Sequence, residues 1–324
     1  MVWKKKLTAT ICIVGLTILL VTTNNRIFSF MNHAKTDSSD VTVISSPMSK
    51  QDQLLYEQIQ EEANKQYIAP ENAKIDRVWK AIPGYNGLKI DVDKTFELAR
   101  LNTKNSLIPY QYVEVKPEIQ LSDLGAHPVY RGNSQKKMVS LLINVAWGNE
   151  YLDSMLQTLR DKKVKTTFFL DGSWLKKYPE VAKQIQQEGH EISNHAYSHP
   201  DMATLSRQNQ NIQIEKTEQL LQSILKVNNK WFAPPSGSFN QTTVDVAKQQ
   251  GLQTILWTLD TVDWKKPPAS QIVNKIRSNV DAGTLILMHP TASSRDALAQ
   301  MIEIIEGKGL KIGPVSETLS SDRT

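Results

Sequence analysis

Two histidines, His195 and His199 in the stretch NHAYSHPDM, are the first residues whose type and spacing could do chemistry. A neutral imidazole is a common ligand of divalent metals, and two imidazoles four positions apart can face one ion. The pair alone is a weak signal, because histidines at this spacing often have structural roles. His289 ends the apolar stretch TLILMH, a position where a general acid could lie.

Two aspartates stand three positions apart in LWTLDTVDWKKP, after another apolar stretch. Asp260 and Asp263 can orient a histidine or hold a cation, and the alternative is that they cap a helix or close a turn. Trp264 and Trp257 can stack on sugar rings, although tryptophan is more commonly part of a core. Trp264 and Pro235, which lies in a rigid Pro-Pro turn, are our candidates for contact with a substrate.

Alternating strands and helices must position these residues. From Met138 onwards, short apolar stretches alternate with helical patterns, which indicates a parallel sheet with crossover helices. About six or seven such units favour a closed or distorted (β/α) barrel over an open sheet, and in that architecture function lies where strands end. Strands are expected in 138–148, 165–172, 190–196, 231–235, 252–259 and 284–290, and helices in 149–163, 174–190, 207–226, 240–251, 269–280 and 294–309.

Taken together and in this order, these segments resemble the polysaccharide deacetylase family, the NodB-homology domain of carbohydrate esterase family 4. The resemblance covers about residues 138–315. The five motifs of the family read roughly T-F-D-D-G, H-S/T-x-x-H, R-P-P-Y, D-x-x-D-W and L-x-H. The corresponding stretches are LLINVAWG (141–148), HAYSH (195–199), APPSG (233–237), DTVDW (260–264) and LMH (287–289). INVAWGNE and PPSGSFN are similar to the sporulation-associated, YlxY-like branch of the family.

The resemblance implies an activity and a cofactor. Family members remove N- or O-acetyl groups from peptidoglycan or chitin-like polymers with a divalent metal, usually zinc. By this resemblance His195 and His199 are metal ligands, and His289 is the acid that protonates the leaving amine. One or both of Asp260 and Asp263 would orient His289 and tune its pKa.

The first motif departs from the family pattern. Asn144 stands where the family has its basic aspartate, and Val145 or Ala146 stands for the metal-binding aspartate, depending on a small gap before Gly148. An amide cannot act as a general base, and two histidines fall short of the three protein ligands usual in catalytic zinc sites. Ala233 replaces the arginine that pairs with the basic aspartate. The joint loss is coherent, because an arginine without its partner would be a poorly solvated, unpaired charge.

We therefore predict a polysaccharide deacetylase-like protein that acts on or binds cell-wall glycan, with impaired or absent metal-dependent hydrolysis and weak binding of zinc. One alternative is a hydrolase with a substituted base, for which Glu150 and Asp201 are the nearby carboxylates in sequence. The ordinary deacetylase mechanism is another. A third alternative is a non-catalytic scaffold at the cell surface that binds glycan or protein, for example in sporulation.

The start of the chain predicts export. Lys4–Lys6 precede Leu7–Asn25, an uncharged stretch that is typical of a secretory signal or a membrane anchor. The absence of a clear small-residue cleavage pattern favours the anchor, and the lysines place the body outside the cytoplasm. The expected parts are a signal anchor or signal peptide (1–30), a linker (31–50), a small N-terminal α/β domain of unknown role (51–131) and the deacetylase-like domain (132–324). In the small domain we expect helices at 51–63 and from 93 to 99, with strands after Gly87 and at 111–115.

Composition excludes several classes of protein. The chain has 324 residues, of which 40% are hydrophobic and 22% charged, values ordinary for globular proteins. The net charge of +5 is concentrated at the start, where residues 1–45 hold five basic side chains against two aspartates. A nearly neutral body argues against a nucleic-acid partner. The single cysteine, Cys12, excludes a disulfide framework and a cysteine-rich zinc site.

Overall fold

The computed structural model describes residues 48–101 and 107–323. The chain divides into two compact units, with the boundary after Glu57. The predicted signal segment (1–30) and nearly all of the predicted linker (31–50) lie outside the described residues. Among the residues that are described, no helix is long and apolar enough to cross a membrane. The proposed domain boundary between residues 131 and 132 remains a prediction.

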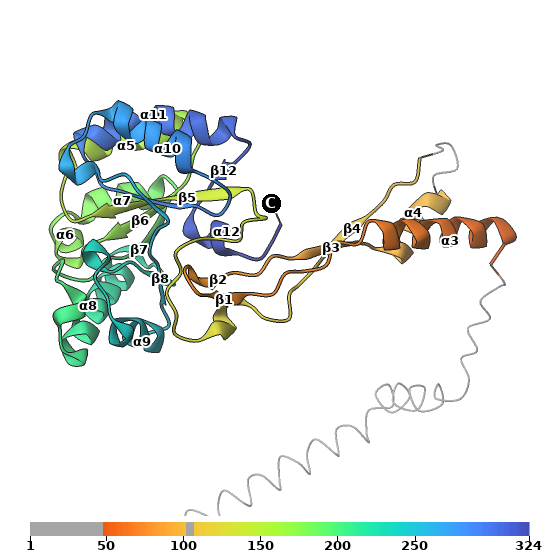
Figure 1. Cartoon of the computed structure of the whole chain (residues 1–324), viewed down its shortest axis with the longest axis horizontal. Helices are drawn as coiled ribbons and strands as arrows, with labels where there is room; N and C mark the ends of the chain where they lie inside the picture. The colour runs from red at the N-terminus through yellow and green to blue at the C-terminus, as the bar shows by residue number, and fades with distance from the viewer. Residues whose placement is uncertain (1–47, 102–106, 324) are drawn as a thin grey trace, which may run out of the picture. The chain divides into compact units, whose positions relative to one another are not determined.

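A curled parallel sheet forms the centre of the larger unit (Figure 1). Its strands pair in the order β10-β11-β5-β6-β7-β8-β9, and β12 pairs with the start of β5. No strand pairing in the described part of the chain joins β9 to β10, so the sheet is a half-barrel and not a closed barrel. The strands are β5 (Met138–Val145), β6 (Thr167–Leu170), β7 (Glu191–Asn194), β8 (Trp231–Phe232), β9 (Gln253–Thr254), β10 (Leu259–Asp260), β11 (Leu285–Met288) and β12 (Lys311–Ile312).

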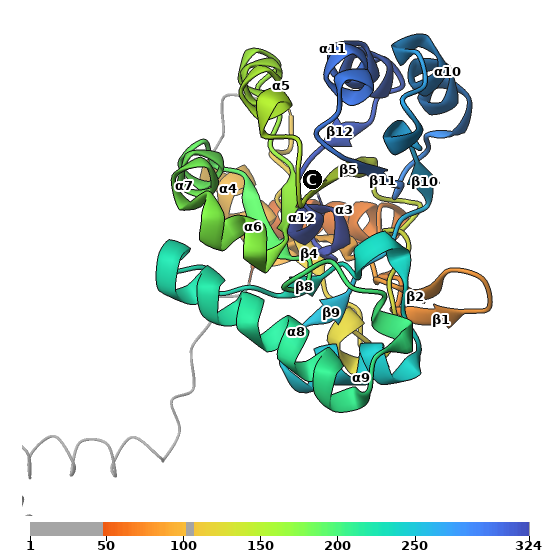
Figure 2. The same ribbon diagram turned by 90° about the vertical axis from the view of Figure 1, so that its left-hand side faces the viewer.

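Helices surround the strands (Figure 2), as the alternating sequence pattern predicts. The prediction of an α/β fold with a parallel sheet is thus confirmed. The helices are α5 (Asn149–Asp161), α6 (Gly172–Lys177), α7 (Pro179–Gln187), α8 (Arg207–Leu220), α9 (Gln241–Gln249), α10 (Ala269–Asn279), α11 (Ala292–Gly307) and α12 (Val315–Leu319). A π-helical turn, Leu221–Leu225, extends α8 close to its predicted end.

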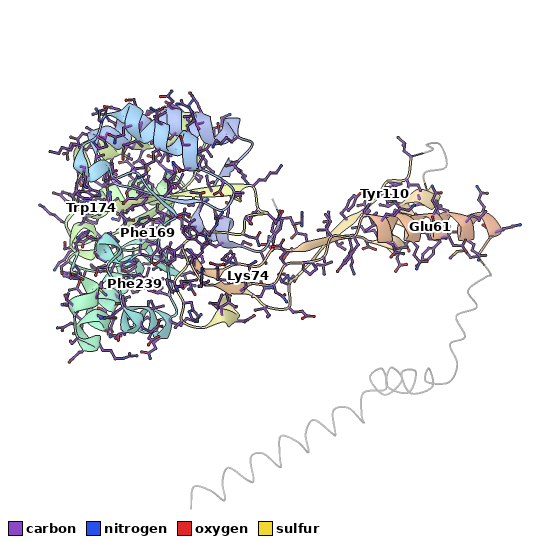
Figure 3. All side chains as sticks on the ribbon, in the orientation of Figure 1. Glu61, Lys74, Tyr110, Phe169, Trp174 and Phe239 are labelled. Carbon is purple, nitrogen blue, oxygen red and sulfur yellow. The ribbon has the colours of Figure 1, made fainter. Side chains whose placement is uncertain are left out.

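The alternation of side chains along β5 builds both layers of the core. All eight residues of β5 are buried. Leu141 and Ile143 pack in the cluster beneath the helices, whereas Leu142 packs inside the half-barrel with Phe169. Figure 3 labels Phe169 among the strands. Because successive strand side chains point to opposite faces, Asn144 follows Leu142 onto the inner face, just where β5 ends.

Two elements differ from the sequence prediction. The helix expected over 174–190 is broken at Tyr178, because Pro179 has no N–H to continue a helix and disfavours helical geometry in the residue before it. The strand expected over 252–259 is divided into β9 and β10. Between them the backbone changes partners: the Ile255 N–H donates to Phe232, the Leu256 N–H to Val129 and the Thr258 N–H to Leu285. This segment therefore crosses the open side of the half-barrel.

The residues before β5 form smaller elements. They are α3 (Lys50–Lys65), β1 (Lys74–Asp76), β2 (Lys80–Ile82), β3 (Gly87–Ile90), α4 (Val92–Leu101) and β4 (Tyr112–Val115). Of these, α3, α4, β3 and β4 lie at the predicted positions, whereas β1 and β2 were not predicted. β1 pairs with β2 and β3 with β4, both antiparallel. Val129 then joins the edge of β9, since its N–H donates to the Thr254 carbonyl at 2.9 Å.

Candidate functional site

A cavity of about 430 Å³ lies where the strands of the half-barrel end. Five of the predicted site residues line this cavity, because parallel strands carry their carboxyl ends to one edge of the sheet. The residues that line it are Asn144, Trp147, His199, Ser236, Trp257, Asp260, Trp264, Leu287 and His289. His195, Asp263 and Pro235 are buried and are not among the lining residues.

His195 is fixed in one tautomer. It follows β7, is 1% exposed, and has its Nδ1 2.8 Å from the Ala233 carbonyl oxygen. A carbonyl can only accept a hydrogen bond, so Nδ1 carries the proton and Nε2 keeps its lone pair. Burial lowers the pKa of His195 to about 3, which keeps the ring neutral near pH 7. A neutral imidazole with a free Nε2 is the form that binds metals.

A tight loop, and not a helical turn, brings His199 back to His195. Their ring centroids are 5.2 Å apart in an edge-to-face arrangement. Ala196 and His199 both have left-handed backbone geometry, with φ of 59° and 53°. The Asn194 side chain accepts a hydrogen bond from the Ala196 N–H, and the Gln213 side chain accepts from the next two N–H groups. Burial also lowers the pKa of His199.

The opposite wall of the cavity carries a hydrogen-bonded pair of His289 and Asp263. Asp263 is fully buried, and its Oδ1 lies 2.8 Å from His289 Nδ1. Its Oδ2 accepts hydrogen bonds from the His289 N–H at 2.6 Å and from the Ser294 hydroxyl. The carboxylate thus fixes the ring of His289 and leaves Nε2 as the nitrogen able to exchange a proton with a ligand.

Asp260 and Trp264 have separate positions on the same wall. Asp260 lines the cavity and accepts a hydrogen bond from the Val262 N–H at 2.7 Å, within a turn where Val262 has a φ of 56°. Of the two aspartates, Asp263 is therefore the one that orients His289. Trp264 lines the cavity with 53% of its surface exposed, and Lys265 Nζ lies 4.9 Å from its ring centroid.

The end of β5 lacks the carboxylates that the first motif would supply. Asn144 is buried, and its Oδ1 has no hydrogen-bond partner in the described part of the chain. Trp147 stacks on His289, with ring centroids 5.8 Å apart and planes at 11°. Gly148 has a φ of 85° and a Cβ there would lie 2.0 Å from the Pro290 carbonyl oxygen, so a side chain would not fit. Placing T-F-D-D-G on this stretch without a gap puts its aspartates at Ala146 and Trp147, whereas the gapped placement puts the base at Asn144.

The third motif forms the floor beside His195. Ala233 is fully buried and has no charge to offer the cavity. Pro235, predicted to contact a substrate, is buried, and its neighbour Ser236 lines the cavity instead, with a φ of 54°. A Cβ on Gly237 would lie 2.9 Å from Trp257, so the glycine allows that indole to pack against the turn.

The carboxylates suggested from sequence as substitute bases do not line the cavity. Glu150 is exposed on α5, and Asp201 accepts a hydrogen bond from Ser238. Asp171, which the sequence analysis missed, lies at the end of β6 and caps α6 through its Oδ1. Its Oδ2 is buried without a partner in the described residues. Burial raises the pKa of Asp171, and the hydrogen bonds from Ser173 and Trp174 oppose this rise. The signal that could have found it is a charged residue at the end of an otherwise apolar strand.

The donor set does not fit a catalytic zinc ion. His195 and His199 provide two imidazoles, and in the described residues no group of three or more His, Cys, Asp or Glu side chains is placed to hold a metal. Catalytic zinc sites usually have three protein ligands and an open position. No metal-dependent step therefore follows from this geometry.

These features define a NodB-type deacetylase fold with an altered site. The family model for polysaccharide deacetylase matches residues 131–255. The chain belongs to the polysaccharide deacetylase family and is a deacetylase-like protein. It is 40% identical to the Bacillus subtilis protein YlxY over 93% of this chain and 92% of that one. It is 33% identical to a peptidoglycan-N-acetylglucosamine deacetylase of Bacillus cereus over 64% of this chain and 81% of that enzyme.

A solved structure is similar over most of the chain. It is that of a CE4 family pseudoenzyme from Bacillus anthracis, with 42% identity and a TM-score of 0.76, over 83% of this chain and 96% of that one. A mutant of the same pseudoenzyme has restored enzymatic activity, and its structure gives the same TM-score at 41% identity. The chain is thus similar both to a peptidoglycan deacetylase and to a pseudoenzyme of the same family.

Proposed function

We propose that this protein binds N-acetylated cell-wall glycan in the cavity at the strand ends, with impaired or absent hydrolysis of acetyl groups. The observation that carries the proposal is the make-up of that cavity. Trp147, Trp257 and Trp264 supply aromatic surface, and a few polar groups lie among them. Aromatic walls with a small number of placed polar groups are typical of ligand sites.

Loss of hydrolysis follows from the β5 side of the cavity. Water needs a general base or a metal to attack an amide, and Asn144 offers neither a proton acceptor nor a metal ligand of useful strength. Two relatives support this proposal. The peptidoglycan deacetylase supports a cell-wall glycan as the ligand, and the pseudoenzyme supports impaired hydrolysis. We further propose that His195 and His199 bind zinc weakly.

The proposal includes a place for the protein. The basic start and the uncharged stretch that follows favour a chain attached to the membrane or secreted, with its body outside the cytoplasm. There the glycan would be cell-wall polysaccharide. A role in sporulation rests on the similarity to the YlxY-like branch.

The test measures binding and acetate release together. The full-length chain is titrated with N-acetylglucosamine oligomers by calorimetry, and acetate is assayed over the same range with an active family deacetylase in parallel. We expect saturable binding with acetate release far below that of the active enzyme. Release at the rate of the active enzyme would contradict the proposal, and Asp260→Asn and Asp171→Asn would then locate the base. Absence of glycan binding would favour the alternative, a scaffold for another protein.

A further inference from the structure

A second cavity, of about 630 Å³, lies at the other edge of the sheet. Lys230 and Trp231 line it at the start of β8, and Gln253 lines it at the start of β9. Because the strands are parallel, their starts share one edge and their ends share the other. This cavity is therefore separate from the one that holds His289. We call it the lysine cavity, after Lys116, Lys230 and Lys248 in its walls.

The three lysines come from separate segments and keep their charges unpaired. Lys116 follows β4, Lys230 precedes β8, and Lys248 belongs to α9. Within the described residues, none of the three lysines forms an ion pair with a carboxylate. Lys248 Nζ donates a hydrogen bond to the Ser122 carbonyl oxygen at 3.4 Å. Three cations thus converge on one cavity without the counter-charges that usually neutralise surface lysines.

Asp322 is the acidic residue that lines the lysine cavity. Its carboxylate already accepts hydrogen bonds from the Asn86 side chain at 3.2 Å and from the Ser320 hydroxyl at 2.7 Å. It also interacts electrostatically with Lys136, which is buried. Asp322 therefore has partners of its own, and the cavity keeps a net positive charge.

Long-range hydrogen bonds hold the walls in place. Trp231 Nε1 donates to Glu191 at 3.0 Å and to the Ser316 hydroxyl at 2.9 Å, which fixes the indole ring. Lys136 is 2% exposed, and its Nζ donates to the Glu317 and Ser320 carbonyls at 2.6 and 2.9 Å. The C-terminal wall is thus tied to the residues that precede β5. A cavity with fixed walls loses little conformational entropy when a ligand binds.

We infer that the lysine cavity binds a hydroxylated polymer that carries phosphodiester charges. Lysine ammonium groups act as point charges toward phosphate oxygens. Gln253 lines the same cavity. Its Nε2 donates to the His127 carbonyl, and its side-chain oxygen can accept a hydrogen bond from a hydroxyl group of such a polymer. The charges are spread over three segments, which suits a ligand with repeated charges better than one small ion. This site goes beyond the glycan cavity and does not depend on its occupation.

Calorimetry on the full-length chain tests this inference, with poly(glycerol phosphate) of defined length as the probe. The variant Lys116→Gln/Lys230→Gln/Lys248→Gln removes the three charges while keeping side chains of similar length. We expect about tenfold weaker binding or more, because exposed ion pairs are individually weak but three of them add up. Raising the salt concentration should weaken binding by the parent chain, since the three charges are screened.

The matched control is Lys137→Gln/Lys163→Gln/Lys176→Gln, which changes the net charge equally. These three lysines are exposed and line neither cavity. The affinity of the control for the probe should fall by less than about twofold, because exposed charges away from the binding site contribute little. Trp264→Ala should leave binding of the probe unchanged, so failure of the glycan proposal and failure of this one are distinguishable.

Four outcomes would overturn the inference. The first is no saturable binding of the probe at low salt, and the second is an equal loss in the control variant. The third is tighter binding of a uronic-acid polymer, which would replace phosphodiesters by carboxylates as the preferred charge. The fourth is equal affinity for inorganic phosphate, which would make the site one for a small anion.

Discussion

On the β11 side of the cavity, Asp263 accepts hydrogen bonds from the His289 ring, the His289 N–H and Ser294. On the β5 side, Asn144 Oδ1 is buried with no partner within the described residues, and Trp147 lines the cavity and stacks on His289. On the first side both carboxylate oxygens of Asp263 are hydrogen-bonded, whereas the second side has an orphaned amide oxygen and an aromatic ring. Buried polar groups without partners are uncommon in folded proteins.

The two sides of the cavity differ in how much the stability of the fold depends on their polar residues. Asp263 links the β10 side of the sheet to β11 and to the start of α11, so its loss would disturb the fold as well as the site. The β5 end holds no such network, so its carboxylates could be lost without unfolding the protein. A residue that also belongs to a structural hydrogen-bond network is costly to replace, whereas a residue outside such a network is not.

The largest effect should come from Asp263→Ala. It leaves the buried donors of His289 and Ser294 without an acceptor, and we expect the free energy of unfolding to fall by about 3–5 kcal/mol. Urea unfolding of the full-length chain measures this. Asp260→Ala is the control, and it should cost about 1 kcal/mol, because that carboxylate accepts one hydrogen bond, from the Val262 N–H. Equal losses in the two variants would mean that the two aspartates do not differ as described.

The next effect is restoration of the β5 side by Asn144→Asp with Ala233→Arg. The aspartate supplies a base, and the arginine keeps it ionised because a nearby opposite charge lowers the pKa of a carboxyl. General bases contribute roughly 10²–10⁴-fold, and the missing metal carboxylate should hold the gain near 10²-fold. Acetate release from chitin oligomers measures it. Each single variant should gain little, since neither group has its partner.

The ungapped placement of the first motif gives a second pair of variants. If Ala146 and Trp147 stand for the two aspartates, Ala146→Asp/Trp147→Asp should restore more activity than Asn144→Asp/Ala233→Arg. Removing Trp147 also frees the face of His289 on which it stacks. Whichever pair gives the larger acetate release identifies where the base belongs. If neither pair raises release above a parent that is already active, the cavity has kept a base elsewhere.

Zinc binding at His195 and His199 tests the same comparison between the two sides of the cavity. Two imidazoles make an incomplete ligand set, so the ion should be lost on dialysis against a chelator. His199→Ala should weaken the remaining affinity at least about tenfold, equivalent to 1.4 kcal/mol, and leave the fold intact. His190→Gln is a control histidine, since His190 is buried in the core beside Phe168. A stoichiometric ion that survives dialysis would show a third ligand.

Sequence pattern predicted the sheet well because long buried strands leave a clear signature. β5, β6, β7 and β11 fall inside their predicted ranges, and the mainly apolar sequences of β5, β6 and β11 give the clearest signal. The prediction of one strand over 252–259 was wrong. This stretch is also largely apolar, but its backbone changes hydrogen-bond partners from β8 to Val129 and then to β11. This change of partners depends on segments that are distant in sequence, so the local pattern of apolar residues cannot predict it.

The local sequence pattern likewise predicted some residues of the site and missed others. His199, Asp260, Trp264 and His289 follow predicted strands, and the structure brings them to one cavity. Their roles remain predictions. Trp147 was not singled out, because a tryptophan after a strand is indistinguishable in sequence from a core residue. Its stacking on His289 depends on the approach of β5 to β11.

The smallest effect concerns the aromatic surface, and it tests whether the cavity still binds sugar. Trp264→Ala removes an exposed indole from the wall, and loss of one stacking contact is worth about 1 kcal/mol, or about fivefold in affinity. Calorimetric titration with N-acetylglucosamine oligomers measures the change. Trp79→Ala is the matched control, because Trp79 packs with Tyr130 and Arg131 and does not line the cavity. If both variants bind as the parent does, sugar does not contact Trp264. If Trp264→Ala alone loses affinity, the cavity retains a glycan-binding wall on the very side where the hydrogen bonds of Asp263 are intact.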